Sequence, residues 1–346
     1  MELTYHTRRK LRRAGLIALA AALILTVIWG CWVVWVERHI VYTRDGAVID
    51  YALTGADPGT GQLALPPENQ ETVSIFYNDG TEDLVELDIS LRQISGYYIT
   101  ADMLQNDMDT VRATVAALPV GSGVMMDVKS IKGAFYYTSN IEDAPTDSGM
   151  DITAVDQLIA DIASRNLYLI ASVPAFRDRH FGLEHTSCGL PFIGGGGALW
   201  LDGSGCYWLD PTDDGTLDYL TQIARELKNL GFDEVVFTDF CFPESPEIEV
   251  TGNKVTAIQE AAGKLVEEAS TDRFAVSFLA TGSTVNGVAG RSRLYLTDVD
   301  AAAAAAAISG YTVEDPAVNI LFLTDSYDTR YEAFSVLRPM NGVITE

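Results

Sequence analysis

The chain has 346 residues, of which 48 are acidic and 23 basic, and its formal net charge is −25. So acidic a surface would repel nucleic acid and anionic lipid, which excludes a nucleic-acid partner and favours a neutral or cationic one. The hydrophobic fraction of 48% is ordinary for a globular protein, and the length allows one large domain with additional segments.

The N-terminus has the pattern of a membrane anchor. Residues 14–36 hold no charged side chain, and as a helix they are long enough to cross the roughly 30 Å hydrocarbon layer. The preceding tail, residues 1–13, carries five basic side chains, so the positive-inside rule places it in the cytoplasm. We therefore expect a single-pass protein of the cell membrane, with residues 14–36 as a transmembrane signal anchor and the main domain extracellular.

A cleaved leader is the alternative to an anchor. Ile28-Trp29-Gly30-Cys31 faintly resembles a lipoprotein cleavage box, but the apolar run continues through residues 32–36. No Ala-x-Ala cleavage site follows, and the apolar core is longer than that of a signal peptide. The uncleaved anchor is therefore the better prediction.

Residues 37–92 read as a stalk or a small β subdomain. Short strand patterns occur at 41–43 and 47–49, with turn-rich segments and an Asn78-Asp79-Gly80 hairpin signal after them. No chemistry is evident in this segment, so we expect it to hold the following domain away from the membrane.

Residues 93–346 alternate between strand and helix patterns, which is typical of a parallel sheet. Seven or eight units of this size predict an α/β fold of the (β/α)8 TIM-barrel type. A doubly wound open sheet is the alternative, but no Gly-rich phosphate turn follows the first strand. The sequence leaves open whether the barrel closes, because the eighth strand pattern is short. The expected strands are 96–100, 123–129, 167–173, 234–237, 274–279, 294–297, 318–323 and 342–345, and the expected helices are 102–118, 152–166, 215–230, 255–269, 299–308 and 327–337.

Acidic residues follow most of these strands. In a β/α barrel the carboxyl ends of the strands converge on one face, so these side chains should meet there. Paired carboxyls are what glycoside hydrolysis requires, one as proton donor and one as nucleophile or base. The alternative is that they cap helices or balance buried Lys129, Arg177 and Arg273. The acids are Asp127, Asp178, Asp239, Glu244, Asp298 and Asp325.

Four motifs, in order, resemble a bacterial putative glycoside hydrolase family, a glycosidase-like TIM-barrel domain of membrane-anchored or secreted proteins. They are GVMMDVKS at 123–130, ASVPAFRD at 171–178, WLDP at 208–211, and GFDE at 231–234 leading to DFCFP at 239–243. The resemblance implies a TIM barrel that acts on carbohydrate. It maps the family's fourth-strand acid onto Asp239 and its second-strand Asp and Lys onto Asp127 and Lys129.

We therefore predict a glycan-active barrel in which Asp239 is nucleophile or base and Glu244 or Asp127 is the acid. The expected substrate-binding residues are Lys129, Arg177, Asp178, Tyr136 and Trp208. A non-catalytic glycan-binding or scaffold barrel is the alternative. It is favoured by Cys241, which stands where the family has arginine, and by residues 278–282, which contain no acid.

The loop 179–207 is long, and long loops commonly carry function. Its aromatic residues Trp200, Tyr207 and the following Trp208 could form a sugar-stacking platform, although core packing is the better prediction for Trp208. Four glycines at 194–197 suggest a hinge or lid. The histidines of this loop lack the spacing of a metal motif, so neither metal nor cofactor is expected. Cys188 and Cys206 could form a disulfide outside the cell.

Overall fold

The computed structural model describes residues 90–340, except 143, 251 and 281–284, together with short stretches between residues 25 and 49. The chain divides into two units, residues 1–84 and residues 85–346.

In the first unit, β1 (Ile40–Thr43) and β2 (Gly46–Ile49) pair as an antiparallel hairpin, which confirms the two strands expected there. Among the residues that the structure describes, no helix is long and apolar enough to cross a membrane. The tail 1–13, most of the anchor 14–36 and most of the stalk 37–92 lie outside the described residues, so these assignments stay predictions.

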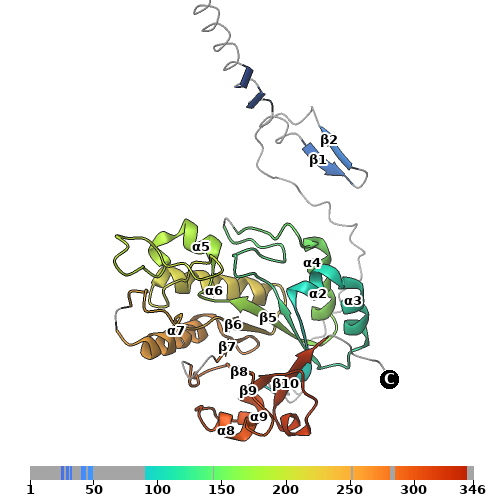
Figure 1. Ribbon diagram of the computed structural model, residues 1–346. Coiled ribbons are helices and arrows are strands. Elements are labelled where there is room, and N and C mark those ends of the chain that lie inside the picture. Colours follow the sequence, from blue (N-terminus) through green and yellow to red (C-terminus); the bar gives the residue numbers. More distant parts are fainter. Residues whose placement is uncertain are drawn as a thin grey trace, which may run out of the picture. The chain divides into compact units, whose positions relative to one another are not determined.

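The second unit is a closed barrel of eight parallel strands (Figure 1). The strand and helix pattern predicted a barrel of this type and left its closure open. The barrel closes where β10 pairs with β3, placing Val336 opposite Ser95. In order around the barrel the strands are β10 (Ser335–Pro339), β3 (Ser95–Ile99), β4 (Gly123–Asp127), β5 (Tyr168–Pro174), β6 (Glu234–Thr238), β7 (Ala275–Leu279), β8 (Leu294–Thr297) and β9 (Ile320–Leu323).

The end of the chain differs from the prediction. The helix expected over 327–337 is a short 3-10 turn, η2 (Thr329–Ala333), followed at once by β10, the eighth strand of the barrel. The strand expected at 342–345 lies outside the described residues. Val336 and Leu337 are fully buried between β9 and β3, and pairing on both sides overrides the weak helical spacing.

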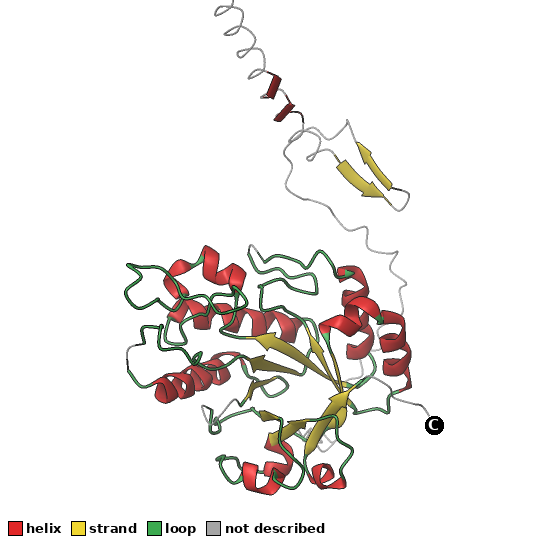
Figure 2. Cartoon of the chain, in the orientation of Figure 1, coloured by secondary structure: helices red, strands yellow, loops and turns green. Residues whose placement is uncertain are grey.

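The helices cover the barrel unevenly (Figure 2). The first half is covered by long helices with apolar faces, while the second half has only single-turn or two-turn elements. The alanine run predicted to be helical over 299–308 is helical only at its end. The helices are α2 (Ala101–Asn106), α3 (Met108–Ala117), α4 (Ile152–Ala163), α5 (Arg179–Glu184), η1 (Thr186–Cys188), α6 (Asp214–Asn229), α7 (Lys254–Ala269), α8 (Ala304–Ile308) and α9 (Pro316–Asn319).

Side chains fill the barrel interior in layers, because alternate residues of each strand point inward. The middle layer is apolar and includes Met125, Ile170, Val236 and Leu337. Strands β3 and β4 approach closely at a glycine, since a Cβ on Gly96 would lie 1.8 Å from the carbonyl oxygen of Gly123.

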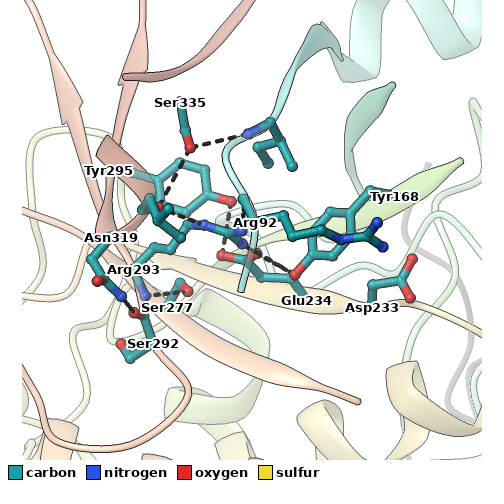
Figure 3. A network of polar contacts seen from close by, with 12 residues as sticks. Arg92, Tyr168, Asp233, Glu234, Ser277, Ser292, Arg293, Tyr295, Asn319 and Ser335 are labelled. Atoms are coloured by element: carbon teal, nitrogen blue, oxygen red, sulfur yellow. Dashed lines mark hydrogen bonds and ion pairs between the residues drawn. The ribbon is translucent and has the colours of Figure 1, made fainter. Parts of the chain in front are cut away.

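The base of the barrel holds a charged network (Figure 3). Glu234 begins β6, Arg293 immediately precedes β8, and their fully buried side chains form an ion pair. Tyr168 and Tyr295 donate hydrogen bonds to the two Glu234 carboxylate oxygens, each at 2.9 Å. A buried ion pair is stable only when hydrogen bonds satisfy its remaining polar atoms, and here they do.

Arg293 also ties distant segments together. Its Nε donates to the carbonyl of Val318 at 3.0 Å, and its Nη2 donates to the carbonyl of Arg92 at 2.7 Å. The guanidinium therefore joins the segment before β3, the strands β6 and β8, and the segment before β9.

Glu234→Gln should lower the free energy of unfolding by about 3–5 kcal/mol, because it leaves the buried Arg293 guanidinium without a counter-charge. Urea unfolding of the detergent-solubilised protein at pH 7, followed by tryptophan fluorescence, measures the change. Asp214→Asn is the matched control, since Asp214 and Lys264 form an exposed pair at 3.4 Å, and it should change stability by less than about 0.5 kcal/mol. Equal stability of Glu234→Gln and the parent would contradict the role given to this pair.

Candidate active site

Asp127 lies at the carboxyl end of β4, opposite Ser172 of β5, in the mouth of the barrel. The backbone N–H of Ala101, at the start of α2, donates to its Oδ2 at 3.0 Å. Burial raises the pKa of Asp127, and the hydrogen bonds from Ala101 and Ser172 only partly oppose that rise. Asp127 is therefore a carboxyl that holds its proton more tightly than an exposed one.

Two tyrosines share this part of the mouth with Asp127. Burial raises the pKa of Tyr98 and of Tyr136, and the charge of Asp127 adds to both shifts. Tyr136, a predicted substrate-binding residue, is 8% exposed. Asp127 thus sits among hydroxyl groups, which suits a site for a hydroxyl-rich ligand.

Asp239 follows the last residue of β6, in a left-handed backbone conformation with φ of 48°. Asp and Asn tolerate this conformation better than other L-residues. The next residue, Phe240, is fully buried, with ring centroids 4.5 Å from Phe176 and 4.5 Å from Phe278. Packing of Phe240 fixes the turn and leaves Asp239 half-buried at the barrel mouth.

The charges around Asp239 act in opposite directions. Burial raises its pKa most, the charges of Arg177 and Lys129 lower it, and that of Asp202 raises it. Asp239 forms no ion pair among the residues that the structure describes. It is therefore a half-buried carboxyl close to cations but bonded to none.

Arg177 is held by Asp202, which the sequence did not single out. Arg177 Nε lies 2.6 Å from Asp202 Oδ2, and Trp208 Nε1 donates to the same oxygen at 3.2 Å. Burial alone would raise the pKa of Asp202. Hydrogen bonds to its carboxylate, which include those from the N–H groups of Cys206 and Ser204, outweigh burial and lower the pKa. The turn-forming run Asp-Gly-Ser-Gly at 202–205 was the sequence signal for this acid.

Trp208 is 7% exposed and packs in the core, as the sequence favoured. The Arg177 guanidinium lies 6.0 Å from the centroid of its ring. Trp208 therefore packs near the Arg177 guanidinium and is not an exposed platform for sugar rings.

Lys129 and Asp178 form a second buried ion pair, with Nζ 2.6 Å from Oδ2 and both side chains fully buried. Tyr219 donates to Asp178 Oδ2 at 3.0 Å, and Asp178 Oδ1 caps α5 by accepting from Phe181 N at 2.8 Å. These two predicted substrate-binding residues thus lie below the surface, where they support the loops after β4 and β5.

Glu244 is exposed, five residues beyond Asp239. Burial raises the pKa of the Cys241 thiol to about 11, and the charges of Asp239 and Glu244 contribute to the rise. The thiol therefore stays protonated at neutral pH. Asp298 and Asp325, after β8 and β9, are also exposed.

Glu226 of α6 is a further residue whose structural role the sequence did not show. It accepts hydrogen bonds from Tyr137 Oη at 2.8 Å and Ser139 Oγ at 2.7 Å, and another from Asn140 N. It therefore clamps the loop after β4, which carries Tyr136, to the helical layer.

The predicted disulfide is not formed: Cys188 and Cys206 are buried free thiols. The Cys188 carbonyl accepts from the N–H of Asp210 at 2.7 Å, so Cys188 lies opposite a residue four positions beyond Cys206. That offset is about 13 Å along an extended strand, whereas a disulfide requires Cα atoms within about 7 Å.

No group of three or more His, Cys, Asp or Glu side chains in the described part of the chain is arranged to hold a metal ion.

A family model described as "Putative glycosyl hydrolase domain" matches residues 96–289, more than half of the chain. The chain belongs to this family. The match confirms the resemblance that the four sequence motifs suggested, and it spans the strands that carry Asp127 and Asp239. The comparison with curated proteins found no match.

Solved structures are similar to it at low identity. A hypothetical protein of Ruminiclostridium thermocellum ATCC 27405 is 22% identical, with a TM-score of 0.45 and coverage of 52% of this chain and 96% of that one. The GH36 α-galactosidase AgaA of Geobacillus stearothermophilus, in complex with raffinose, is 11% identical, with a TM-score of 0.50 and coverage of 74% and 40%. A GH20 β-N-acetylglucosaminidase is 11% identical, with a TM-score of 0.44 and coverage of 68% and 52%. The match spans about half or less of these two glycosidases, and the likeness to AgaA shows a shared fold.

Asp239→Asn should stabilise the protein at pH 7, by about 0.5–2 kcal/mol, as is common when a functional site is relieved of an unfavourable charge. The sign follows from the raised pKa of Asp239: the folded state binds the proton more tightly, so stability is lost as pH rises through the folded pKa. Asn also keeps the left-handed turn, which Ala would strain.

Urea unfolding at pH 7 and at pH 3 tests this expectation. The difference between Asp239→Asn and the parent should shrink at pH 3, below the ordinary pKa of 3.8, where Asp239 is protonated in both states. A variant less stable than the parent at pH 7 would contradict the burial of an unpaired carboxyl.

Proposed function

We propose that this protein is a glycoside hydrolase displayed on the outer face of the cell membrane, and that it cleaves a glycan with the carboxyl pair Asp127 and Asp239. One observation carries the proposal. Two half-buried carboxyls, neither bonded to a cation among the described residues, end β4 and β6 of a glycosyl hydrolase domain. Barrel enzymes place their chemistry at this end of the strands.

The surroundings assign different roles to the two carboxyls. The pKa of Asp127 is raised by burial and no cation opposes the rise, so Asp127 is the proton donor to the leaving glycosidic oxygen. The pKa of Asp239 is also raised, but Arg177 and Lys129 favour its ionised form. Asp239 is therefore the nucleophile or the base that activates water.

The spacing of the strands is compatible with such a pair. β4 and β6 lie on either side of β5, so their backbones are about 10 Å apart at a spacing of about 4.8 Å per strand. Side chains that turn into the mouth close part of that gap, toward the roughly 5–9.5 Å between the carboxyls of known glycosidases. The exposed Glu244 is the competing proton donor.

Asp127→Asn and Asp239→Asn should each lower kcat by about 10²–10⁴-fold, the range expected for loss of a positioned acid or base. The release of reducing sugar from a panel of cell-wall and exopolysaccharide glycans measures kcat. Glu244→Gln should lower kcat less than about tenfold if Asp127 is the acid. Equal turnover by Asp239→Asn and the parent would rule out Asp239 as a catalytic residue.

The pH dependence of activity tests the role of Asp127 as proton donor independently. Activity should fall on the alkaline side as Asp127 loses its proton, and that limb should lie above pH 3.8 because the pKa of Asp127 is raised. Asp127→Asn should abolish this limb from any residual activity.

A non-catalytic glycan-binding barrel is the second candidate. Cys241 next to the site, in place of the family's arginine, favours it, as does the apolar end of β7 at Leu279 and Ala280. Glycan binding without turnover by either the parent or Asp239→Asn would support this function and contradict hydrolysis.

The proposed location rests on residues 14–36, whose uncharged run and basic flank are those of a signal anchor. The protein should remain in the membrane pellet after carbonate extraction, and protease added to intact cells should remove the barrel. Deletion of residues 2–36 should leave the product in the cytoplasm. Carbonate-soluble full-length protein would contradict the anchor.

A further inference from the structure

Isolated antiparallel bridges order the long loop between β5 and α6. Pro191 pairs with Leu199, and Phe192 N donates to the Ala198 carbonyl at 2.9 Å. The glycine run at 194–197, expected as a hinge or lid, connects these bridged segments, and three of its residues have positive φ.

The same segment is also bonded to residues further along the chain. Leu190 N donates to the Trp208 carbonyl at 2.7 Å, and Ile193 N donates to the Glu247 carbonyl at 2.8 Å. The segment is therefore bonded to the loop after β6, which begins with Asp239.

This part of the loop exposes large apolar side chains to solvent. Phe192 is 38% exposed, Ile193 51% and Leu201 47%, and Trp200 lies beside them, half-buried, with its Nε1 donating to Glu247 Oε2 at 3.3 Å. We call Phe192, Ile193, Trp200 and Leu201 the apolar rim. Apolar side chains gathered on one exposed structure generally mark a binding surface.

The apolar rim is linked to the proposed site through Asp202. Leu201 pairs with Tyr207, and the residue after Leu201 is Asp202, which holds Arg177 at 2.6 Å. Arg177 is in turn one of the charges that act on Asp239. The rim therefore belongs to the same loop as the acid that positions a cation near Asp239.

We propose that the apolar rim binds uncharged sugar residues of a long glycan, so that the substrate is a polysaccharide held beyond its cleavage point. This inference rests on the proposed function. Sugar rings present apolar C–H faces that pack on aromatic and aliphatic side chains, while nearby polar groups such as Glu247 bind their hydroxyls. A lipid surface fits less well, because a chain of net charge −25 is repelled by anionic lipid.

Affinity electrophoresis of the full-length protein in detergent tests the proposal. The gels contain glycol chitin, hydroxyethyl cellulose, xylan or dextran, and the Asp239→Asn background prevents degradation. At least one polysaccharide should retard the protein, and adding Phe192→Ser with Leu201→Ser should weaken that binding about tenfold, or about 1.4 kcal/mol. Val120→Ser and Val255→Ser replace apolar residues that are 77% and 52% exposed outside the rim, and should leave binding unchanged.

Several outcomes would overturn the proposal. They are equal retardation of the rim variant and its parent, no retardation by any of the polysaccharides, or a rim variant that loses self-association or binding to phosphatidylglycerol vesicles instead. Loss of self-association would assign the rim to a second copy of the chain, and loss of vesicle binding would assign it to a lipid surface.

The kinetics of the active protein separate this inference from the proposed function. Rim substitutions should raise KM for the polysaccharide and leave kcat and the KM for a disaccharide unchanged. If the parent hydrolyses the polysaccharide and the rim substitutions leave its KM unchanged, the role given to the rim is contradicted and the hydrolase function is not. If the rim binds polysaccharide but the parent releases no reducing sugar, the hydrolase function is contradicted and the role of the rim is not.

Discussion

The buried pair Glu234–Arg293 is the constraint on which the barrel depends. Two charges removed from water are costly unless every polar atom around them is satisfied, and two tyrosine hydroxyls together with the carbonyls of Arg92 and Val318 do this here. These partners come from both halves of the chain. The second half of the barrel has little helical cover, so the network at its base helps to define closure where packing alone would do less.

At the mouth of the barrel, the cations are paired but two carboxyls are not. Lys129 is bonded to Asp178 and Arg177 to Asp202, so both cations near the site are already paired. Asp127 and Asp239 are half-buried without such a partner, and their raised pKa values are the physical consequence. Keeping carboxyls in this state costs stability, and the proposed acid–base role would use their raised pKa values.

The sequence predicted the elements with strong local patterns. The first seven barrel strands and the acids at their ends followed from alternation of strand and helix, and the motifs around Asp127 and Asp239 led to the family. The sequence missed β10, because its pattern is weak until β9 and β3 pair with it. Lys129 and Asp178 were assigned to substrate, because no linear pattern shows that two charges separated in sequence are buried together. Asp202 was missed for the same reason.

Asp127 and Asp239 are half-buried carboxyls without a cationic partner, whereas Asp178 and Asp202 are paired with Lys129 and Arg177. A pH titration of selectively ¹³C-labelled aspartate carboxyls by NMR tests it most directly, with assignments from the Asn variants. We expect Asp127 and Asp239 to titrate above 3.8 and Asp202 to titrate below it. Titration of Asp127 and Asp239 at or below 3.8 would contradict it.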